Sequence, residues 1–388
     1  MATMTTGQCA APCESRLLHV LLIYRHMIPS VLLCGHCQME YLHSQGQVEY
    51  RAVQEMSLRH SDLDWADVVL LARCDCSYER RVSKALRLAG KQLVYIIDDD
   101  LLSVPQHLSS AWYYHLPRVR KDITAMLEMS HAIVSPSPLL LEKYANGKVA
   151  IPVEEPALFP LPYQPHDPAQ PVKIGFAGSI DRTGDVEAIL GGALRRIKAE
   201  YGDRVAFEFF GAVPAFAADL GAKATPYCQS YEEYRSALNQ AGWDIGLAPM
   251  PDSPFHRHKH YNKFIEYAAA GIVGVFSDVQ PYTRLHDFAE DCALFCSQEE
   301  HWYQQLKYLL DHPAEREAMR LKASEFAAGR LSLPVCAQDL LRHLQMLPLP
   351  SGDKVRICLT LNKFPDLARR GKQKIIRMTK SAIRKILP

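Results

Sequence analysis

The stretch from His256 to Tyr282, HRHKHYNKFIEYAAAGIVGVFSDVQPY, predicts a helix, a tight stop and a buried strand. Asn262 is a suitable N-cap, strong helix formers follow it, and Gly271 is placed to end the helix. The β-branched run at 272–276 is typical of an inner strand in a parallel sheet. A helix followed by a buried parallel strand indicates an α/β fold.

Three charged side chains stand at the front of this otherwise apolar unit: Lys259, Lys263 and Glu266. A helix N-terminus favours an anion, because its free N–H groups present positive charge. Lys263 and Glu266 are three positions apart and therefore share one face of the helix. A cation for a phosphate beside a carboxylate for two hydroxyls is what a nucleotide-sugar site needs. Taken singly, each residue is more typical of the solvated first turn of a surface helix.

The rest of the chain shows the same alternation of strands and helices twice. It runs through residues 17–150 and restarts at residue 172. Between the two, Ile151–Pro171 holds seven prolines, which remove N–H donors and disfavour helix and inner strand. We therefore predict two doubly wound α/β domains, at 17–150 and 172–346, joined by a proline-rich linker at 151–171. Residues 1–16 are polar, and we expect them to be disordered.

Charge is distributed unevenly along the 388 residues. The net charge of +1 argues against a general nucleic-acid binder. Residues 366–388 hold eight Lys/Arg and one Asp, so the remaining chain is acidic, at −6. In this part of the 347–388 tail, isoleucines fall on one helical face and Lys and Arg on the other. This pattern favours a helix that lies on an anionic membrane, although a solvated tail or one docked on the acidic remainder is the alternative.

The sequence predicts a cytoplasmic protein, peripheral on the inner face of the membrane if the tail binds lipid. No apolar run approaches the about 18 residues of a membrane span, and the N-terminus lacks the regions of a secretory signal. The eleven cysteines are scattered and are best interpreted as reduced thiols. Cys34–Cys37 (CGHC) resembles the redox motif of disulfide isomerases, but no strand leads directly into it. Cys74 and Cys76 do not complete a standard zinc spacing with that pair.

Two turns after predicted strands supply further polar groups. Gly178 and Ser179 lie between a strand and a helix, where backbone can approach a phosphate. The full glycine fingerprint of dinucleotide sites is absent, so a purely structural turn is equally consistent with this pattern. The triplet Asp98, Asp99 and Asp100 follows another strand, at the edge where open α/β sheets place their sites. We predict an acceptor-side role for it, and a helix N-cap is the alternative.

Five segments of the second half occur in a characteristic order: IGFAGS at 174–179, FEFFG at 207–211, WDIGLAPM at 243–250, KFIEYAAAG at 263–271 and VFSDVQPY at 275–282. Together they resemble the C-terminal domain of the group 1 glycosyltransferases. YIIDDDL at 95–101 and ADVVLLAR at 66–73 resemble the N-terminal domain of the same broad family. The resemblance covers most of residues 17–345 and implies the GT-B fold, two Rossmann-like domains that face each other across a cleft.

The resemblance also implies that the second domain holds most of a nucleotide-diphosphate sugar. Glu266 matches the family glutamate that bonds the nucleotide ribose, and Lys259 and Lys263 match basic positions near the pyrophosphate. Gly178 matches the phosphate-side glycine, and we include the adjacent Ser179 in the donor site. The family often carries a second glutamate near the sugar, eight positions before the first. Here that position is His258, so the sugar-side contact is altered, and we expect His258 or His256 to touch donor or acceptor.

These features predict a glycosyltransferase that moves a sugar from a nucleotide-diphosphate sugar to a hydroxyl of a glycan or lipid-linked acceptor, in polysaccharide or glycoconjugate assembly. Lys259 and Lys263 would neutralise the leaving diphosphate. The predicted catalytic residues are His258 and the triplet Asp98, Asp99 and Asp100.

The resemblance implies retention at the anomeric carbon and no obligatory metal or other cofactor. The aspartate triplet does resemble the metal-binding Asp-x-Asp of the other large glycosyltransferase fold, but that fold has no second Rossmann half. Two alternatives stay open. One is a nucleotide-sugar epimerase on the same fold, and the other is a non-catalytic scaffold, which the histidine at position 258 suggests.

Overall fold

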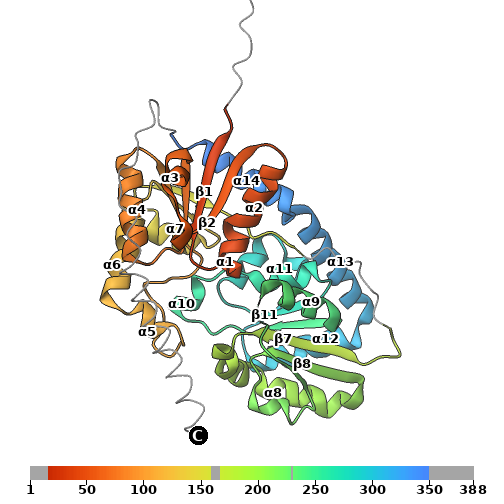
Figure 1. Ribbon diagram of the computed structural model, residues 1–388. Helices are drawn as coiled ribbons and strands as arrows, with labels where there is room; N and C mark the ends of the chain where they lie inside the picture. Colours follow the sequence, from red (N-terminus) through yellow and green to blue (C-terminus); the bar gives the residue numbers. More distant parts are fainter. Residues whose placement is uncertain (1–15, 159–166, 229, 349–388) are drawn as a thin grey trace, which may run out of the picture.

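The structure, a computed structural model, describes residues 16–158, 167–228 and 230–348. It contains two six-stranded sheets whose neighbouring strands are all parallel. Helices flank both sheets, and the two units face each other (Figure 1). The predicted fold class, two Rossmann-like domains, is confirmed. The expected disordered N-terminus, apart from residue 16, and the basic tail after residue 348 lie outside the described residues, as does the middle of the predicted linker.

The first sheet has the strand order β2-β1-β3-β4-β5-β6. We call this sheet and its helices the first domain. β3 and β4 are buried on both faces, as expected of apolar inner strands between two helical layers. Its elements are β1 (Leu18–Tyr24), α1 (Pro29–Val31), η1 (Leu32–His36), α2 (Cys37–Ser44), β2 (Val48–Gln54), α3 (His60–Trp65), β3 (Val68–Ala72), α4 (Ser77–Leu88), β4 (Gln92–Ile96), α5 (Ala111–Tyr114), α6 (Pro117–Met129), β5 (Ala132–Ser135), α7 (Pro138–Tyr144) and β6 (Val149–Pro152).

The second sheet has the order β12-β11-β10-β7-β8-β9 and, with its helices, forms the second domain. Its elements are β7 (Val172–Gly178), η3 (Ile180–Arg182), α8 (Thr183–Tyr201), β8 (Val205–Gly211), β9 (Lys223–Thr225), α9 (Tyr231–Ala241), β10 (Ile245–Ala248), α10 (Pro254–Arg257), α11 (Asn262–Ala269), β11 (Val273–Ser277), β12 (Ala293–Cys296), α12 (Glu299–Asp311), α13 (Pro313–Arg330) and α14 (Leu333–Gln345).

The stretch that predicted the fold forms α10, α11 and β11. Gly271 ends α11 with a φ of +70°, a conformation that suits glycine at a helix C-terminus. The expected N-cap at Asn262 is wrong by one position, because Tyr261 occupies the cap and Asn262 is the first helical residue. Tyr261 is buried and its hydroxyl donates to Glu154, and this contact anchors the turn without a polar side-chain cap.

The last described helix crosses back to the first domain. α14 packs against α2, and Ala337, Leu340 and Leu344 belong to the core that surrounds β1 and β3. In Figure 1, α14 lies beside the first-domain strands, whereas α12 and α13 flank the second domain. The sequence pattern had placed this helix among the closing helices of the second domain. A helical sequence pattern does not say which of the two cores covers the apolar face of the helix.

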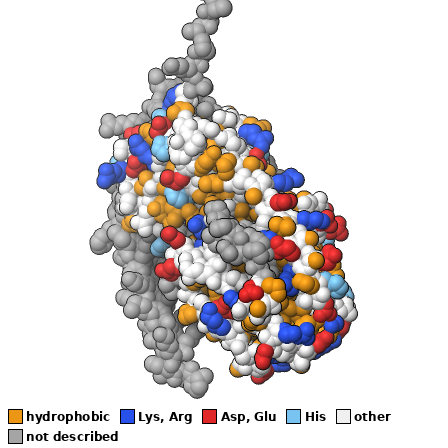
Figure 2. Space-filling model, turned by 90° about the vertical axis from the view of Figure 1, so that its right-hand side faces the viewer, with side chains coloured by type: hydrophobic (Ala, Val, Ile, Leu, Met, Phe, Trp, Pro, Cys, Tyr) orange, Lys and Arg blue, Asp and Glu red, His pale blue; other side chains and the backbone are white. Residues whose placement is uncertain are grey.

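The surface carries charges of both signs. Figure 2 shows Lys, Arg, Asp and Glu mixed over the lower part of one face, with hydrophobic side chains gathered nearer its middle. Among the residues that the structure describes, no helix combines the length and apolar character needed to cross a membrane.

Candidate functional site

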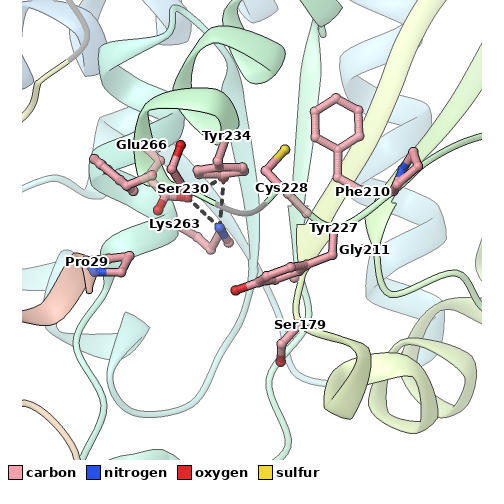
Figure 3. A pocket seen from close by; sticks show the side chains of 14 residues that line it. Pro29, Ser179, Phe210, Gly211, Tyr227, Cys228, Ser230, Tyr234, Lys263 and Glu266 are labelled. Atoms are coloured by element: carbon pink, nitrogen blue, oxygen red, sulfur yellow. Dashed lines mark hydrogen bonds and ion pairs between the residues drawn. The ribbon is translucent and has the colours of Figure 1, made fainter. Parts of the chain in front are cut away.

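A cavity of about 210 Å³ opens at the carboxyl ends of β7 and β8. Four of the predicted donor-binding residues line it together, Gly178 and Ser179 from the turn after β7 and Lys263 and Glu266 from α11. The first domain contributes Pro29 to the lining (Figure 3). Open parallel sheets bind ligands at this edge, so the position agrees with the general rule for such folds.

Glu266 is the most specifically held side chain in this cavity. It is 8% exposed, and its Oε2 accepts a hydrogen bond from the Tyr234 hydroxyl at 2.7 Å. Lys263 forms an ion pair with the same oxygen and donates to the Tyr234 hydroxyl at 3.0 Å. Figure 3 shows the three side chains converging on one point. Within the described chain no group donates to Oε1, so this oxygen is available to a ligand.

Tyr234 is a site residue that the sequence analysis missed. It lies on α9, 32 residues before its partner Glu266. Nothing in the sequence pattern of that helix links the tyrosine to α11.

Gly178 and Gly211 let the ends of β7 and β8 approach closely. Gly211 has a φ of +76°, and a Cβ at this position would collide with the carbonyl oxygen of Gly178. The next amide, of Ala212, donates to that same carbonyl at 3.0 Å. The ring of Tyr227 lies against Gly211, lines the cavity and is 57% exposed. A flat exposed ring of this kind suits stacking on a planar ligand.

Arg182 is a second residue that the sequence analysis missed. It ends the η3 turn, four residues after Gly178. Its Nη2 donates to the Pro249 carbonyl at 2.5 Å, and its Nε lies 3.0 Å from Asp185. A basic side chain so close to the glycine turn was a visible signal in the sequence. It adds a cation to the edge of the sheet where a phosphate would be placed.

Lys259 does not share the contacts of Lys263. Its Nζ lies 2.7 Å from Oδ1 of Asp99, on the first domain. The structure thus brings together a predicted donor-side lysine and a predicted acceptor-side aspartate. Burial alone raises the pKa of Asp99, but Lys259 and Arg73 outweigh it and lower that pKa to about 2. Asp99 is therefore ionised at neutral pH.

The other two aspartates of the triplet have different partners. Asp98 Oδ1 accepts from Arg73 at 2.5 Å. Asp100 is buried and is held by Lys143 at 2.6 Å and by the Tyr144 hydroxyl, both on α7. Asp100 therefore ties the turn after β4 to α7. Among the described residues, no three His, Cys, Asp or Glu side chains are grouped to hold a metal ion.

Arg73 is a third residue that the sequence analysis did not single out. It follows β3 with a φ of +51°, a conformation that non-glycine residues rarely adopt. Backbone strain of this kind concentrates at functional sites. Here it accompanies a guanidinium that contacts both Asp98 and Asp99.

The histidines of the opening stretch separate in space. His258 is half-buried at the end of α10, and its Nδ1 lies 2.5 Å from the Pro254 carbonyl oxygen. His256 is buried, and its Nδ1 lies 2.7 Å from the Ser253 hydroxyl. Burial, followed by Arg182 and Lys259, lowers the pKa of His256 to about 4, so the ring is neutral at pH 7. His256, rather than His258, therefore lies among the cations at the boundary between the domains.

The CGHC motif lacks an exposed thiolate. Cys34 is completely buried in η1, and its Sγ donates to Glu155 Oε1 at 3.2 Å. Burial, assisted by the Glu155 carboxylate, raises the pKa of the Cys34 thiol well above its usual range. A protonated, inaccessible thiol does not serve thiol–disulfide exchange, so the geometry offers no support to the redox alternative.

Residues 192–342 match the glycosyl transferase-like family. The matched region includes Lys259, Lys263 and Glu266, and it confirms the predicted class of enzyme, a glycosyltransferase. No curated protein matches the sequence.

Solved structures share the two-domain arrangement. The HepE protein of Anabaena, in complex with UDP and glucose, is 11% identical with a TM-score of 0.55, over 84% of this chain and 99% of that one. An α-glucosyltransferase in complex with UDP and a 13-mer DNA containing an HMU base is 11% identical with a TM-score of 0.58, over 85% and 99%. A Listeria monocytogenes protein assigned as a UDP-N-acetylglucosamine 2-epimerase is 13% identical with a TM-score of 0.53, over 88% and 100%. At these identities the similarity establishes the GT-B fold.

Proposed function

We propose that the protein is a group 1 glycosyltransferase that uses a nucleoside diphosphate sugar as donor. The observation that carries this proposal is the pair of Glu266 and Lys263 in the cavity beside Gly178. Glu266 keeps one oxygen free for the two ribose hydroxyls, while Lys263 places a cation next to it. The phosphates would lie beside the turn at Gly178, where glycine places no side chain between a ligand and the backbone.

The base of the nucleotide would stack on Tyr227. Its exposed ring lines the same cavity as Lys263 (Figure 3). The neighbours from Anabaena and with the DNA 13-mer both contain UDP, which favours uridine diphosphate for this chain. A tyrosine ring alone would stack on any nucleotide base, so the preference for uridine rests on those two neighbours.

The cations at the boundary between the domains would stabilise the departing diphosphate. Lys263 lines the cavity, Arg182 ends the turn after Gly178, and Lys259 stands at the entrance to α11. Positive charge aimed at a leaving group acts most strongly where water is excluded, as between two closed domains. Retention at the anomeric carbon is the outcome that the group 1 resemblance implies.

The acceptor would approach from the first domain, where Asp99 contacts Lys259 of the second domain and Arg73 holds both Asp98 and Asp99. A glycan or lipid-linked hydroxyl fits this role, in polysaccharide or glycoconjugate assembly. Residues 366–388, outside the described chain, remain our candidate for contact with an anionic membrane.

The test is release of UDP from a panel of UDP-sugars by the purified full-length protein. We expect one donor to be turned over, and Glu266→Ala to lower kcat/KM by about 30-fold or more, because the ribose loses a charge-assisted hydrogen bond. Glu232→Ala, on the exposed face of α9, is the matched control and should behave as the wild type. Unchanged kinetics in the Glu266→Ala variant would show that this cavity is not the donor site.

An epimerase is the second candidate, favoured by the fold shared with the Listeria protein. An epimerase needs no acceptor, so incubation with UDP-N-acetylglucosamine alone distinguishes the two. NMR of the products would show the 2-epimer of the sugar for an epimerase. For a transferase, which here has water as its only acceptor, it would show free UDP and the hydrolysed sugar. A scaffold protein would bind UDP and yield neither product.

A further inference from the structure

One ion pair connects the two domains at the proposed reaction site. Lys259 Nζ lies 2.7 Å from Asp99 Oδ1, although the two residues are 160 positions apart. Both side chains are about a quarter exposed, at 27% and 25%. Neither is fixed by burial alone, so each remains able to change partner when a ligand enters from solvent.

The two oxygens of Asp99 are held by different domains. Oδ2 lies 3.4 Å from Nη1 of Arg73, on the first domain, and Arg73 is also held by Asp98 at 2.5 Å. Oδ1 is held by Lys259, from the second domain, and within the described residues no other group donates to it. Departure of Lys259 would therefore free one oxygen while Arg73 keeps the carboxylate in place.

Lys259 precedes the helix whose Lys263 and Glu266 line the donor cavity. It lies four residues before Lys263 on the same segment, and the charge of Lys259 and that of Arg182 both act on His256. Because His256 is neutral at pH 7, the positive charge offered to a phosphate here comes from the lysine and the arginine. A diphosphate is a stronger ligand for a lysine than a single carboxylate, because it carries more negative charge.

Other contacts between the domains surround the ion pair of Lys259 and Asp99. Phe255 of α10 packs against Val104 and Ala111 of the first domain. The Ser109 hydroxyl donates to Asp181 Oδ2 at 2.7 Å, in the turn after Gly178. One first-domain segment, residues 98–116, thus touches both parts of the second domain that would hold the donor.

We propose that Lys259 exchanges Asp99 for the diphosphate when the donor binds, and that the freed Oδ1 of Asp99 then accepts the hydrogen bond of the acceptor hydroxyl. Asp99 is in this view an acceptor-binding residue that is covered until the donor is in place. Donor therefore binds first and acceptor second. This inference rests on the proposed function.

The test is calorimetric titration of the full-length protein with UDP. Asp99→Asn removes the negative charge that competes for Lys259, so we expect UDP to bind about 2- to 5-fold more tightly, the range of a partly exposed ion pair. Lys259→Met should weaken UDP binding. In the Lys259→Met background, the Asp99→Asn change should have no further effect, because the exchange needs both residues.

Asp252→Asn is the matched control. Asp252 precedes α10 on the second domain, as Lys259 follows it, but Asp252 pairs with Arg257 at 2.6 Å and not with Lys259. The affinity of the Asp252→Asn variant for UDP should differ from that of the wild type by less than twofold. Asp99→Ser serves as a second variant if the asparagine variant unfolds at a lower temperature than the wild type.

A second readout separates the acceptor role from the donor role. With the UDP-sugar that supports UDP release, Asp99→Asn should lower KM and also lower kcat about 10-fold or more, because a neutral amide oxygen replaces the charged carboxylate that accepts from water or the acceptor hydroxyl. Two results would overturn the proposed exchange of Lys259 from Asp99 to the diphosphate and leave the proposed function intact. One is UDP binding by Asp99→Asn that is equal to or weaker than that of the wild type. The other is the same gain in UDP affinity when Asp99→Asn is added to Lys259→Met. If the wild type binds no nucleoside diphosphate, the proposed function fails as well.

Discussion

The hydroxyl of Tyr234 lies 2.7 Å from Oε2 of Glu266, on the helix that the sequence most clearly predicted. Tyr234 and Lys263 both contact this oxygen, and among the described residues no group donates to the other oxygen, Oε1. The orientation of the carboxylate is therefore set by a neighbouring helix, α9, as well as by α11 itself. A ligand that needs one carboxylate oxygen in a fixed place finds it already oriented, which lowers the entropic cost of binding.

Tyr234→Phe tests this positioning role. We expect UDP to bind about 3- to 10-fold more weakly, because the carboxylate loses one of two contacts that orient it. Since Tyr234 would act through Glu266, the donor KM should rise while kcat changes little. Calorimetry and initial rates measure both. Tyr308→Phe, on the second-domain surface, is the control, and equal behaviour of the two variants would refute the positioning role.

Gly211→Ala tests the close approach of β7 and β8. The free energy of unfolding should fall by about 2–4 kcal/mol, because the new Cβ meets the Gly178 carbonyl and the φ of +76° disfavours alanine. Gly242→Ala is the control, with a φ of +60° but the nearest side-chain atom 3.7 Å from the added Cβ. It should lose only about 1 kcal/mol. Urea denaturation measures both, and similar losses would mean that the two strand ends are not in contact.

His256 makes the stability of the protein depend on pH. Its pKa is about 4 in the folded protein, against an ordinary value of about 6.5. Between these values the unfolded chain binds a proton that the folded protein does not. The contribution of the neutral ring to stability is therefore complete above pH 6.5 and is lost as the pH falls toward 4.

The measurement compares the wild type with His256→Gln. Between pH 7 and pH 5 the free energy of unfolding of the wild type should fall by about 1 kcal/mol more than that of the variant, a value discounted by about half for solvent screening. Other groups that titrate in this range cancel in the difference. Parallel pH profiles of the two proteins would contradict the lowered pKa.

Cys34 should be inert in the folded protein. Because its thiol is buried and protonated, iodoacetamide at pH 8 should label Cys34 only after unfolding. Mass spectrometry of peptides from native and urea-treated protein measures this, with Cys228, which is partly exposed, as the accessible reference. Rapid native labelling of Cys34, or a disulfide to Cys37, would restore the redox interpretation.

The fold was predictable because the apolar runs and the glycine stops are local signals. The β-branched run at 272–276 forms most of β11, and Gly271 ends α11 as expected. Such patterns depend on neighbours within a few positions, which the sequence displays directly. The attachment of α14 to the first domain was not predictable in this way, since its apolar face fits either core.

The candidate site was predictable only in part. Lys263 and Glu266 share a helical face, so their pairing followed from their spacing. The contact of Lys259 with Asp99 joins residues on two domains and depends on how those domains face each other. Arg73 and Tyr234 lie on elements whose patterns were clear, but long-range packing gives these residues their place in the site.

Binding of UDP to the wild type and to Glu266→Gln, measured side by side by calorimetry, tests whether Glu266 holds the ribose of a nucleotide donor. We expect saturable binding of one UDP per chain to the wild type, and binding weaker by about 10-fold or more in the variant, because an amide cannot replace the carboxylate between the ribose hydroxyls and Lys263. Equal affinity of the two proteins, or no binding of any nucleoside diphosphate to the wild type, would contradict it.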